Sequence, residues 1–229
     1  MELDLSHFRE LCEKLTSREV DLLLGFDIRA IERTLLDSAL KISPDADISG
    51  LGRALHDGNQ TWIGLDERIL CTSYKEIFKM FDLIGLESHH VVVDLGAAYG
   101  RMGIVMNSLR PSARYLGLEY VPERVEEGNR VFEKHHCLNA ELIEQDLFAK
   151  NFEMPEADIY FLYEYGRIDH IKHTLDQVQK KGRNRKIKLI ARGDSTISMI
   201  NYYHPWLAHV YRPHHDEFFS IYSNFQDVV

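Results

Sequence analysis

The chain has 229 residues, a formal net charge of −9, and 45% hydrophobic and 28% charged residues. These values are ordinary for one large globular domain, or for a core domain with an appendage. The acidic balance argues against a protein that coats nucleic acid through phosphate contacts, so nucleic acid is not favoured as a partner. The sequence holds no apolar run long enough to span a bilayer, and we expect no membrane partner.

The cysteines give a hint of the cellular compartment. Cys12, Cys71 and Cys137 are scattered along the chain and form no C-x-x-C pair. An odd number without a pattern indicates a reducing compartment rather than a disulfide framework. The acidic residues 1–4 also lack the layout of a signal peptide. We therefore expect a cytoplasmic protein.

Apolar residues recur at helical spacing through residues 1–41, which predicts several helices. Ser17 stands where the second of them could begin. Residues 48–59 are polar and contain glycines, as is typical of a loop. Short helices with an apolar stripe need a partner to pack against. We therefore expect residues 1–71 to form a helical extension or cap on a core domain of residues 72–229.

A predicted helix, capped by Thr72 or Ser73, leads into the most informative stretch of the chain. Residues 91–93 are three valines, which suit a strand buried on both faces of a parallel sheet. Small residues follow at positions 96, 97, 98 and 100, and an amphipathic helix then runs to Leu109. A strand, a tight turn and a helix in this order let a ligand approach the backbone near the partly positive helix end.

The rest of the chain alternates strands and helices. We expect strands at 114–119, 141–146, 157–163 and 187–192, and helices at 122–136 and 168–180. Residues 206–212 and 217–223 alternate as the two strands of an antiparallel hairpin do. The prediction is an α/β fold with a doubly wound, seven-stranded, mostly parallel sheet, a C-terminal antiparallel hairpin and an N-terminal helical extension.

The spacing of the small residues distinguishes between two kinds of nucleotide-binding motif. A dinucleotide fingerprint, G-x-G-x-x-G, would need glycines at 98 and 101, where the chain has alanine and arginine. The run Asp94-x-Gly96-x-Ala98-x-Gly100 instead resembles the first motif of class I S-adenosylmethionine-dependent methyltransferases, Asp/Glu-x-Gly-x-Gly-x-Gly. Ala98 replaces the middle glycine of that motif.

Glu119 ends the next predicted strand, at the roughly 20-residue separation expected of an acid that binds ribose hydroxyls. The resemblance further implies that Asp146 binds the adenine amino group while an apolar neighbour packs on the ring. It also implies that Arg101 could meet the methionine carboxylate and that Tyr74 could reach over the cofactor. Each has a structural alternative: Asp146 could cap a helix, Arg101 could point to solvent, and Tyr74 could be a half-buried surface residue. The cofactor contacts predicted in this way are Asp94, Gly96, Ala98, Gly100, Arg101, Glu119, Tyr120, Asp146, Leu147 and Tyr74.

The fourth strand of the core ends in Tyr163-Glu164-Tyr165, at the sheet edge where ligands bind. The family places substrate-orienting or catalytic groups here, but the Asn/Asp-Pro-Pro-Tyr motif of enzymes that methylate nucleic-acid amino groups is absent. Tyr163 and Glu164 are therefore the candidate catalytic residues. Glu164 could act as a base or orient a nucleophile, or it could simply pair with Arg167 or Arg192.

The 12 histidines show no zinc-binding spacing. The magnesium pattern of catechol-type methyltransferases would leave only Glu164 and Asp194 as ligands, so we expect no metal. The resemblance implies an enzyme that transfers a methyl group from S-adenosyl-L-methionine to a small-molecule or protein acceptor. The alternatives are a non-catalytic S-adenosylmethionine-binding module of the same fold and, less favoured, an NAD-dependent oxidoreductase. The sequence gives no indication of which acceptor is used or of an oligomeric state.

Overall fold

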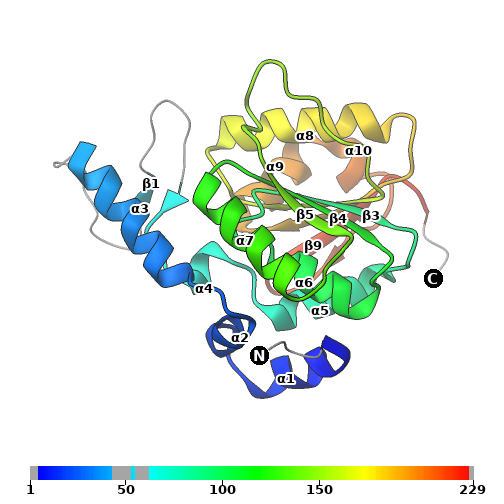
Figure 1. Ribbon diagram of the computed structural model, residues 1–229. Coiled ribbons are helices and arrows are strands. Elements are labelled where there is room, and N and C mark those ends of the chain that lie inside the picture. The colour runs from blue at the N-terminus through cyan, green and yellow to red at the C-terminus, as the bar shows by residue number, and fades with distance from the viewer. Residues whose placement is uncertain (1–4, 43–52, 55–61, 227–229) are drawn as a thin grey trace.

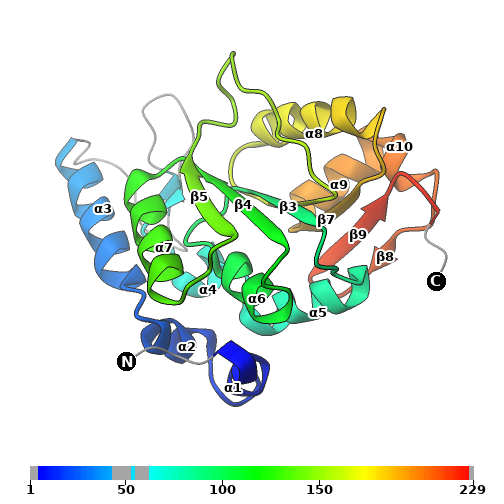
Figure 2. The same cartoon turned by 45° about the vertical axis from the view of Figure 1, so that its right-hand side comes forward.

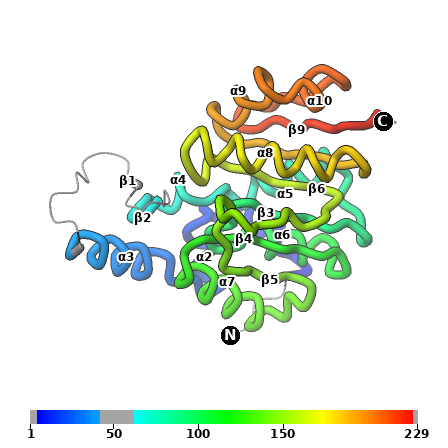
Figure 3. The backbone as a smooth tube through the Cα atoms, turned by 90° about the horizontal axis from the view of Figure 1, so that it is seen from above, coloured from blue at the N-terminus to red at the C-terminus, as the bar shows by residue number. Residues whose placement is uncertain are grey.

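A sheet of seven strands lies between two layers of helices (Figure 1). The computed structural model describes residues 5–42, 53–54 and 62–226. One layer holds α5 (Tyr74–Ile84), α6 (Arg101–Leu109) and α7 (Pro122–Lys134), and the other holds α8 (Ile168–Gly182), α9 (Asp194–Tyr203) and α10 (Pro205–Ala208) (Figure 1; Figure 3 shows the same helices from above). This arrangement confirms the predicted doubly wound architecture.

The strand order fixes where a ligand can bind. The strands are β3 (Val91–Leu95), β4 (Arg114–Glu119), β5 (Ala140–Glu144), β6 (Ile159–Tyr163), β7 (Lys188–Arg192), β8 (His214–His215) and β9 (Phe219–Ser223). They lie in the order β5-β4-β3-β6-β7-β9-β8 (Figure 2). The first five in this order are parallel, and β9 pairs antiparallel with both β7 and β8. The order reverses between β3 and β6, so a crevice is expected at their carboxyl ends.

The run of valines in β3 is explained by burial on both faces of the sheet. Val92 and Val93 are both fully buried, and successive side chains of a strand point to opposite faces. Val92 belongs to the apolar cluster that contains Ile104 of α6, whereas Val93 belongs to the cluster that contains Leu175 of α8. A central strand between two helix layers therefore has no polar face.

The predicted N-terminal helices are present. The segment consists of a 3₁₀ turn at Leu5–His7, α1 (Phe8–Lys14), α2 (Ser17–Leu24), α3 (Ile28–Ile42), β1 (Arg53–Ala54), β2 (Trp62–Ile63) and α4 (Glu67–Leu70). Strands β1 and β2 pair with each other, and most of the loop predicted at 48–59 lies outside the described residues. The segment lies against the layer formed by α5, α6 and α7 (Figure 1).

Two helices begin with a capping box, in which a hydroxyl and a carboxylate satisfy backbone N–H groups reciprocally. Ser17 is the first residue of α2, but the cap is Thr16, whose hydroxyl accepts a hydrogen bond from the N–H of Glu19 while the Glu19 carboxylate accepts one from the N–H of Thr16. At α5 the cap is Ser73, paired with Glu76 in the same way, as the sequence predicts.

The tail differs from the prediction of a long hairpin. Residues 206–212 do not form a strand, because Pro205 begins the short helix α10. Proline suits the first position of a helix, where no N–H is needed, and Leu207 of this turn is fully buried. The hairpin therefore consists of β9 and the short strand β8.

Candidate functional site

A cavity of about 270 Å³ opens beside the carboxyl ends of β3, β4, β5 and β6. Its volume is close to the lower end of the range for small-molecule sites. Eight of the residues predicted from the sequence line it: Gly96, Ala98, Glu119, Tyr120, Asp146, Leu147, Tyr163 and Glu164. The fold therefore brings together residues that follow four different strands.

The turn after β3 has a left-handed backbone at Gly96 (φ 83°), Ala98 (φ 48°) and Gly100 (φ 74°). Ala98 thus adopts a conformation that favours glycine, which accounts for the glycine usual at this position of the motif. A Cβ atom on Gly96 would lie 2.3 Å from the Cβ of Tyr165, so only glycine lets the chain after β6 pack directly on the turn. Gly100 lies outside the cavity lining and precedes α6, where a Cβ atom would lie 2.7 Å from the ring of Phe132.

Glu119 is buried at the end of β4 and joins two turns. One of its carboxylate oxygens accepts a hydrogen bond from the N–H of Ala98 (2.8 Å), and the other accepts bonds from the N–H groups of Tyr120 and Val121 (3.0 Å each). These bonds hold the carboxylate at the cavity wall. A carboxylate has about four lone-pair sites, so Glu119 keeps capacity for ligand hydroxyls.

The loop after β5 forms another wall of the cavity. An oxygen of Asp146 accepts a hydrogen bond from the N–H of Phe148 (2.8 Å), which shapes the loop, and Leu147 is buried beside it. The ring of Phe148 is 41% exposed and packs on His170, with 4.7 Å between ring centroids. Both Phe148 and His170 line the cavity. Phe148 directly follows the predicted Asp146 and Leu147, whereas no sequence pattern pointed to His170.

Asp94 lies under the turn and borders a second, small cavity of about 20 Å³ together with Arg101. Its Oδ2 accepts a hydrogen bond from the hydroxyl of Tyr115 (2.8 Å). Its Oδ1 is buried and has no hydrogen-bond partner among the described residues. Burial raises the pKa of Asp94 to about 7. A buried carboxylate oxygen without a partner is suited to accept a hydrogen bond from a cationic ligand group.

Comparison with known proteins rests on the fold. No protein-family model matches the sequence, and neither does any curated protein. An RNA methyltransferase from Salinibacter ruber, solved with S-adenosyl-L-homocysteine, is similar at 20% identity and a TM-score of 0.51, over 67% of this chain and 91% of that chain. A precorrin-6y C5,15-methyltransferase from Geobacter metallireducens is similar at 18% identity and a TM-score of 0.53, over 75% and 95% of the two chains. TrmN from Thermus thermophilus is similar at 11% identity and a TM-score of 0.52, over 71% and 55%.

The chain has the class I methyltransferase fold. Its seven-stranded sheet matches the prediction from the motif at positions 94–100. At these identities the likeness establishes the fold alone.

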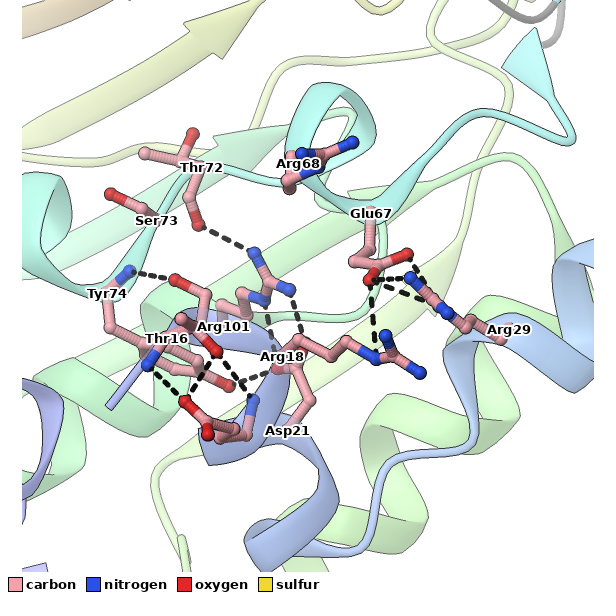
Figure 4. A network of polar contacts seen from close by, with 12 residues as sticks. Thr16, Arg18, Asp21, Arg29, Glu67, Arg68, Thr72, Ser73, Tyr74 and Arg101 are labelled. Atoms are coloured by element: carbon pink, nitrogen blue, oxygen red, sulfur yellow. Dashed lines mark hydrogen bonds and ion pairs between the residues drawn. The ribbon is translucent and has the colours of Figure 1, made fainter.

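Within this methyltransferase fold, Arg101 and Tyr74 hold the N-terminal segment, which differs from their predicted place beside a cofactor (Figure 4). The guanidinium of Arg101 donates to the carboxylate of Asp21 on α2 through Nε (3.0 Å) and Nη2, and to the carbonyl of Thr72 (3.2 Å). The hydroxyl of Tyr74 donates to the same carboxylate (2.7 Å). Arg101 and Tyr74 are both buried, which also excludes the solvent-facing and half-buried alternatives. Asp21, far away in sequence, gave no signal for this pairing.

Glu164 caps a helix. Its Oε1 accepts a hydrogen bond from the N–H of Ser195 (2.6 Å) in the first turn of α9. The alternative that it pairs with Arg192 is wrong, because Arg192 pairs with Glu76 (3.1 Å) and lies over the ring of Tyr163 at 4.2 Å. Tyr163 and Glu164 both line the cavity. One carboxylate oxygen of Glu164 is therefore occupied by the first turn of α9.

The N-terminal segment closes one side of the cavity through Trp62, Leu65, Ile69 and Leu70. The indole N–H of Trp62 donates to the carbonyl of Glu164 (3.0 Å), which joins β2 to the chain after β6. Arg124 also lines the cavity and forms an ion pair with Glu32 of the segment. No periodic pattern in the sequence points to these wall residues.

Three further observations concern metals, membranes and cysteines. Within residues 5–42, 53–54 and 62–226, no three His, Cys, Asp or Glu side chains are placed to hold a metal ion together. In the same ranges no helix combines the length and apolar character needed to cross a membrane. Cys12, Cys71 and Cys137 are buried and unbridged.

Proposed function

We propose that this protein is a methyltransferase that uses S-adenosyl-L-methionine and methylates a small-molecule or protein acceptor. The observation that carries the proposal is the convergence of the Gly96 turn, the Glu119 carboxylate and Asp146 on one cavity. The fold supports it, because structures that share this fold include an RNA methyltransferase solved with S-adenosyl-L-homocysteine.

The residues fit the proposed cofactor group by group. Glu119 would accept hydrogen bonds from the ribose hydroxyls, and Asp146 with Leu147 would contact the adenine. The amino-acid end of the cofactor carries an ammonium group, and Asp94 offers a buried Oδ1 that has no partner among the described residues. The orphaned oxygen would then gain a cationic donor, which removes the cost of leaving it unpaired.

The cofactor supplies a methyl group already activated on a sulfonium. The task of the protein is to align an acceptor with that methyl group and to exclude water. Trp62 and Leu65 cover the cavity from the N-terminal side, and Tyr163 and Glu164 border it from the end of β6. Their positions make them the candidates for orienting the acceptor.

An NAD-dependent oxidoreductase is disfavoured by one observation. The third glycine of a dinucleotide fingerprint would stand at position 101, where the side chain of Arg101 is buried in an ion pair with Asp21. No observation favours the alternative of a non-catalytic binding module over that of an enzyme.

The first test is calorimetric titration with S-adenosyl-L-homocysteine of the wild type, Glu119→Ala and Glu144→Ala. Glu144 is the matched control, because it pairs in register with Glu119 on the neighbouring strand but is exposed. We expect micromolar binding that Glu119→Ala weakens by about tenfold or more, roughly 1.4 kcal/mol, and that Glu144→Ala leaves intact. A wild type that does not bind would overturn the proposal.

A second test identifies the acceptor class. The protein is incubated with S-adenosylmethionine labelled in its methyl group and a cell extract, which is then separated into small molecules, proteins and nucleic acids. The proposal expects enzyme-dependent label in one of the first two fractions. Label that ribonuclease or deoxyribonuclease releases would overturn the proposed acceptor class while supporting methyl transfer.

A further inference from the structure

Two carboxylates of the N-terminal segment reach arginines in the first turns of core helices. Asp21 of α2 binds Arg101 at the start of α6, and Glu32 of α3 binds Arg124 near the start of α7. All four side chains are buried, with exposed fractions of 3 to 6%. Arg124 also faces Glu119, the proposed ribose-binding acid, with 3.5 Å between Nη1 and Oε1. None of the contacts described for Arg101 involves Glu119.

The distances show which carboxylate holds Arg124. Its Nε lies 2.8 Å from Oε1 of Glu32 and its Nη2 lies 3.1 Å from Oε2, which is the bidentate geometry of a strong charge-assisted pair. The 3.5 Å separation from Glu119 is an ion pair too long for a good hydrogen bond. Arg124 is therefore committed to Glu32, and Glu119 remains bonded to backbone N–H groups.

Glu32 is itself fixed by two groups besides Arg124. The hydroxyl of Tyr99, in the turn after β3, donates to Oε1 (2.8 Å), and the N–H of Gly64 donates to Oε2 (2.9 Å). Arg124 completes the arrangement by donating through Nη2 to the carbonyl of Trp62. Glu32 thus connects the turn, the segment that forms the cavity wall and the arginine beside Glu119.

We propose that Glu32 is a positioning residue for cofactor binding, which holds Arg124 back from Glu119 and so leaves that carboxylate for the ribose. The inference rests on the proposed function. A buried guanidinium that loses one carboxylate partner pairs with the next one available, because an unpaired buried charge is costly. Arg124 would then occupy the oxygens of Glu119, and the neutral ribose hydroxyls would compete poorly with a charged donor.

The same contacts connect the cofactor side of the cavity to its outer wall. Arg124 reaches Glu119 on one side and the backbone of Trp62 on the other. The N-terminal segment therefore contributes to the ribose subsite without touching the ribose. A segment that merely covered the cavity would not affect which sugar is bound.

The experiment compares two ligands on matched variants. Dissociation constants of S-adenosyl-L-homocysteine and of its 2′-deoxyribose analogue are measured for the wild type, Glu32→Gln and Asp21→Asn. Both variants neutralise one buried carboxylate of the N-terminal segment. We expect the wild type and Asp21→Asn to prefer the ribose ligand by roughly tenfold, and Glu32→Gln to reduce that preference to about twofold or less.

The double variant Glu32→Gln/Arg124→Gln gives the deciding control. It removes the arginine that would close on Glu119, and because both partners are neutralised it leaves neither of them as an uncompensated buried charge. The proposal expects it to recover most of the ribose preference, whereas a purely structural role of Glu32 predicts a further loss. The double variant also keeps the test valid if Glu32→Gln alone does not fold.

The measurements separate a failure of the proposed function from a failure of the role inferred for Glu32. If the wild type does not bind S-adenosyl-L-homocysteine, the proposed function falls and this inference falls with it. If the wild type binds with a ribose preference that Glu32→Gln keeps, or that Asp21→Asn loses equally, the inference is overturned while the proposed function stands. A double variant that folds but lacks the preference overturns the inference as well.

Discussion

Replacing Asp94 with asparagine should change how the stability of the protein depends on pH. Burial raises the pKa of this carboxyl from 3.8 to about 7, although the hydrogen bond from Tyr115 acts in the opposite direction. In the unfolded chain the carboxyl ionises near its ordinary pKa. Between about pH 4 and pH 7 the folded state therefore holds a proton that the unfolded state has released.

The sign follows from this difference in bound protons. Stability falls with rising pH wherever the folded state binds more protons than the unfolded state. The rise in the pKa of Asp94 spans about 3 pH units, and at about 1.36 kcal/mol per unit this amounts to roughly 4 kcal/mol. The wild type should lose up to this amount between about pH 4 and pH 7, whereas Asp94→Asn has no such group. The free energy of unfolding of Asp94→Asn relative to the wild type should therefore rise between about pH 4 and pH 7 and stay constant above pH 7.

The assay is urea unfolding of the wild type and Asp94→Asn at a series of pH values, with the difference in free energy of unfolding plotted against pH. Contributions of titrating groups that do not interact with Asp94 cancel in that difference. The new amide places a donor near the buried Oδ1 position, which costs about 1–3 kcal/mol at every pH and changes only the offset. Glu144→Gln, on an exposed strand end, should show a flat difference. A flat difference for Asp94→Asn between pH 4 and 8 would refute the reasoning.

Two further predictions concern the turn and its surroundings. Arg101→Ala leaves Asp21 buried without its cation and should cost about 3–5 kcal/mol in urea unfolding, whereas Arg9→Ala, which breaks an exposed pair, should cost less than about 1 kcal/mol. Equal losses would contradict the anchoring role of Arg101. Gly96→Ala places a Cβ atom 2.3 Å from that of Tyr165 at a φ of +83°, and it should cost about 1–3 kcal/mol and weaken calorimetric binding of S-adenosyl-L-homocysteine. Unchanged binding by a folded variant would remove the turn from the ligand site.

The sequence was sufficient for the core of the fold and for one wall of the cavity. Gly96 and Glu119 could be placed together because parallel strands β3 and β4 are adjacent, so their carboxyl ends meet at one edge. The valine run likewise predicted a central strand because burial on both faces leaves no polar positions. These inferences depend on local pattern and chain connectivity, which a single sequence contains.

The features that could not be predicted depend on tertiary contacts, which the local sequence pattern does not encode. Arg101 was assigned to a cofactor carboxylate, but the carboxylate it binds belongs to Asp21, on a helix far away in sequence. Trp62 lies in a short strand without periodicity, so its place in the cavity wall could not be inferred. The tail was expected to be a long hairpin because its residues alternate, but Pro205 begins a helical turn there.

The two arginine pairs also bear on how the chain acquires its structure. The division at residue 72 follows sequence pattern. We expect the two parts to fold as one cooperative unit, because the counter-ions of Arg101 and Arg124 are Asp21 and Glu32 of the N-terminal segment. A chain leaving the ribosome presents Asp21 and Glu32 well before either arginine is made. We expect the N-terminal helices to stay undocked until α7 has been synthesised, so that a segment translated before the core is among the last to complete its burial.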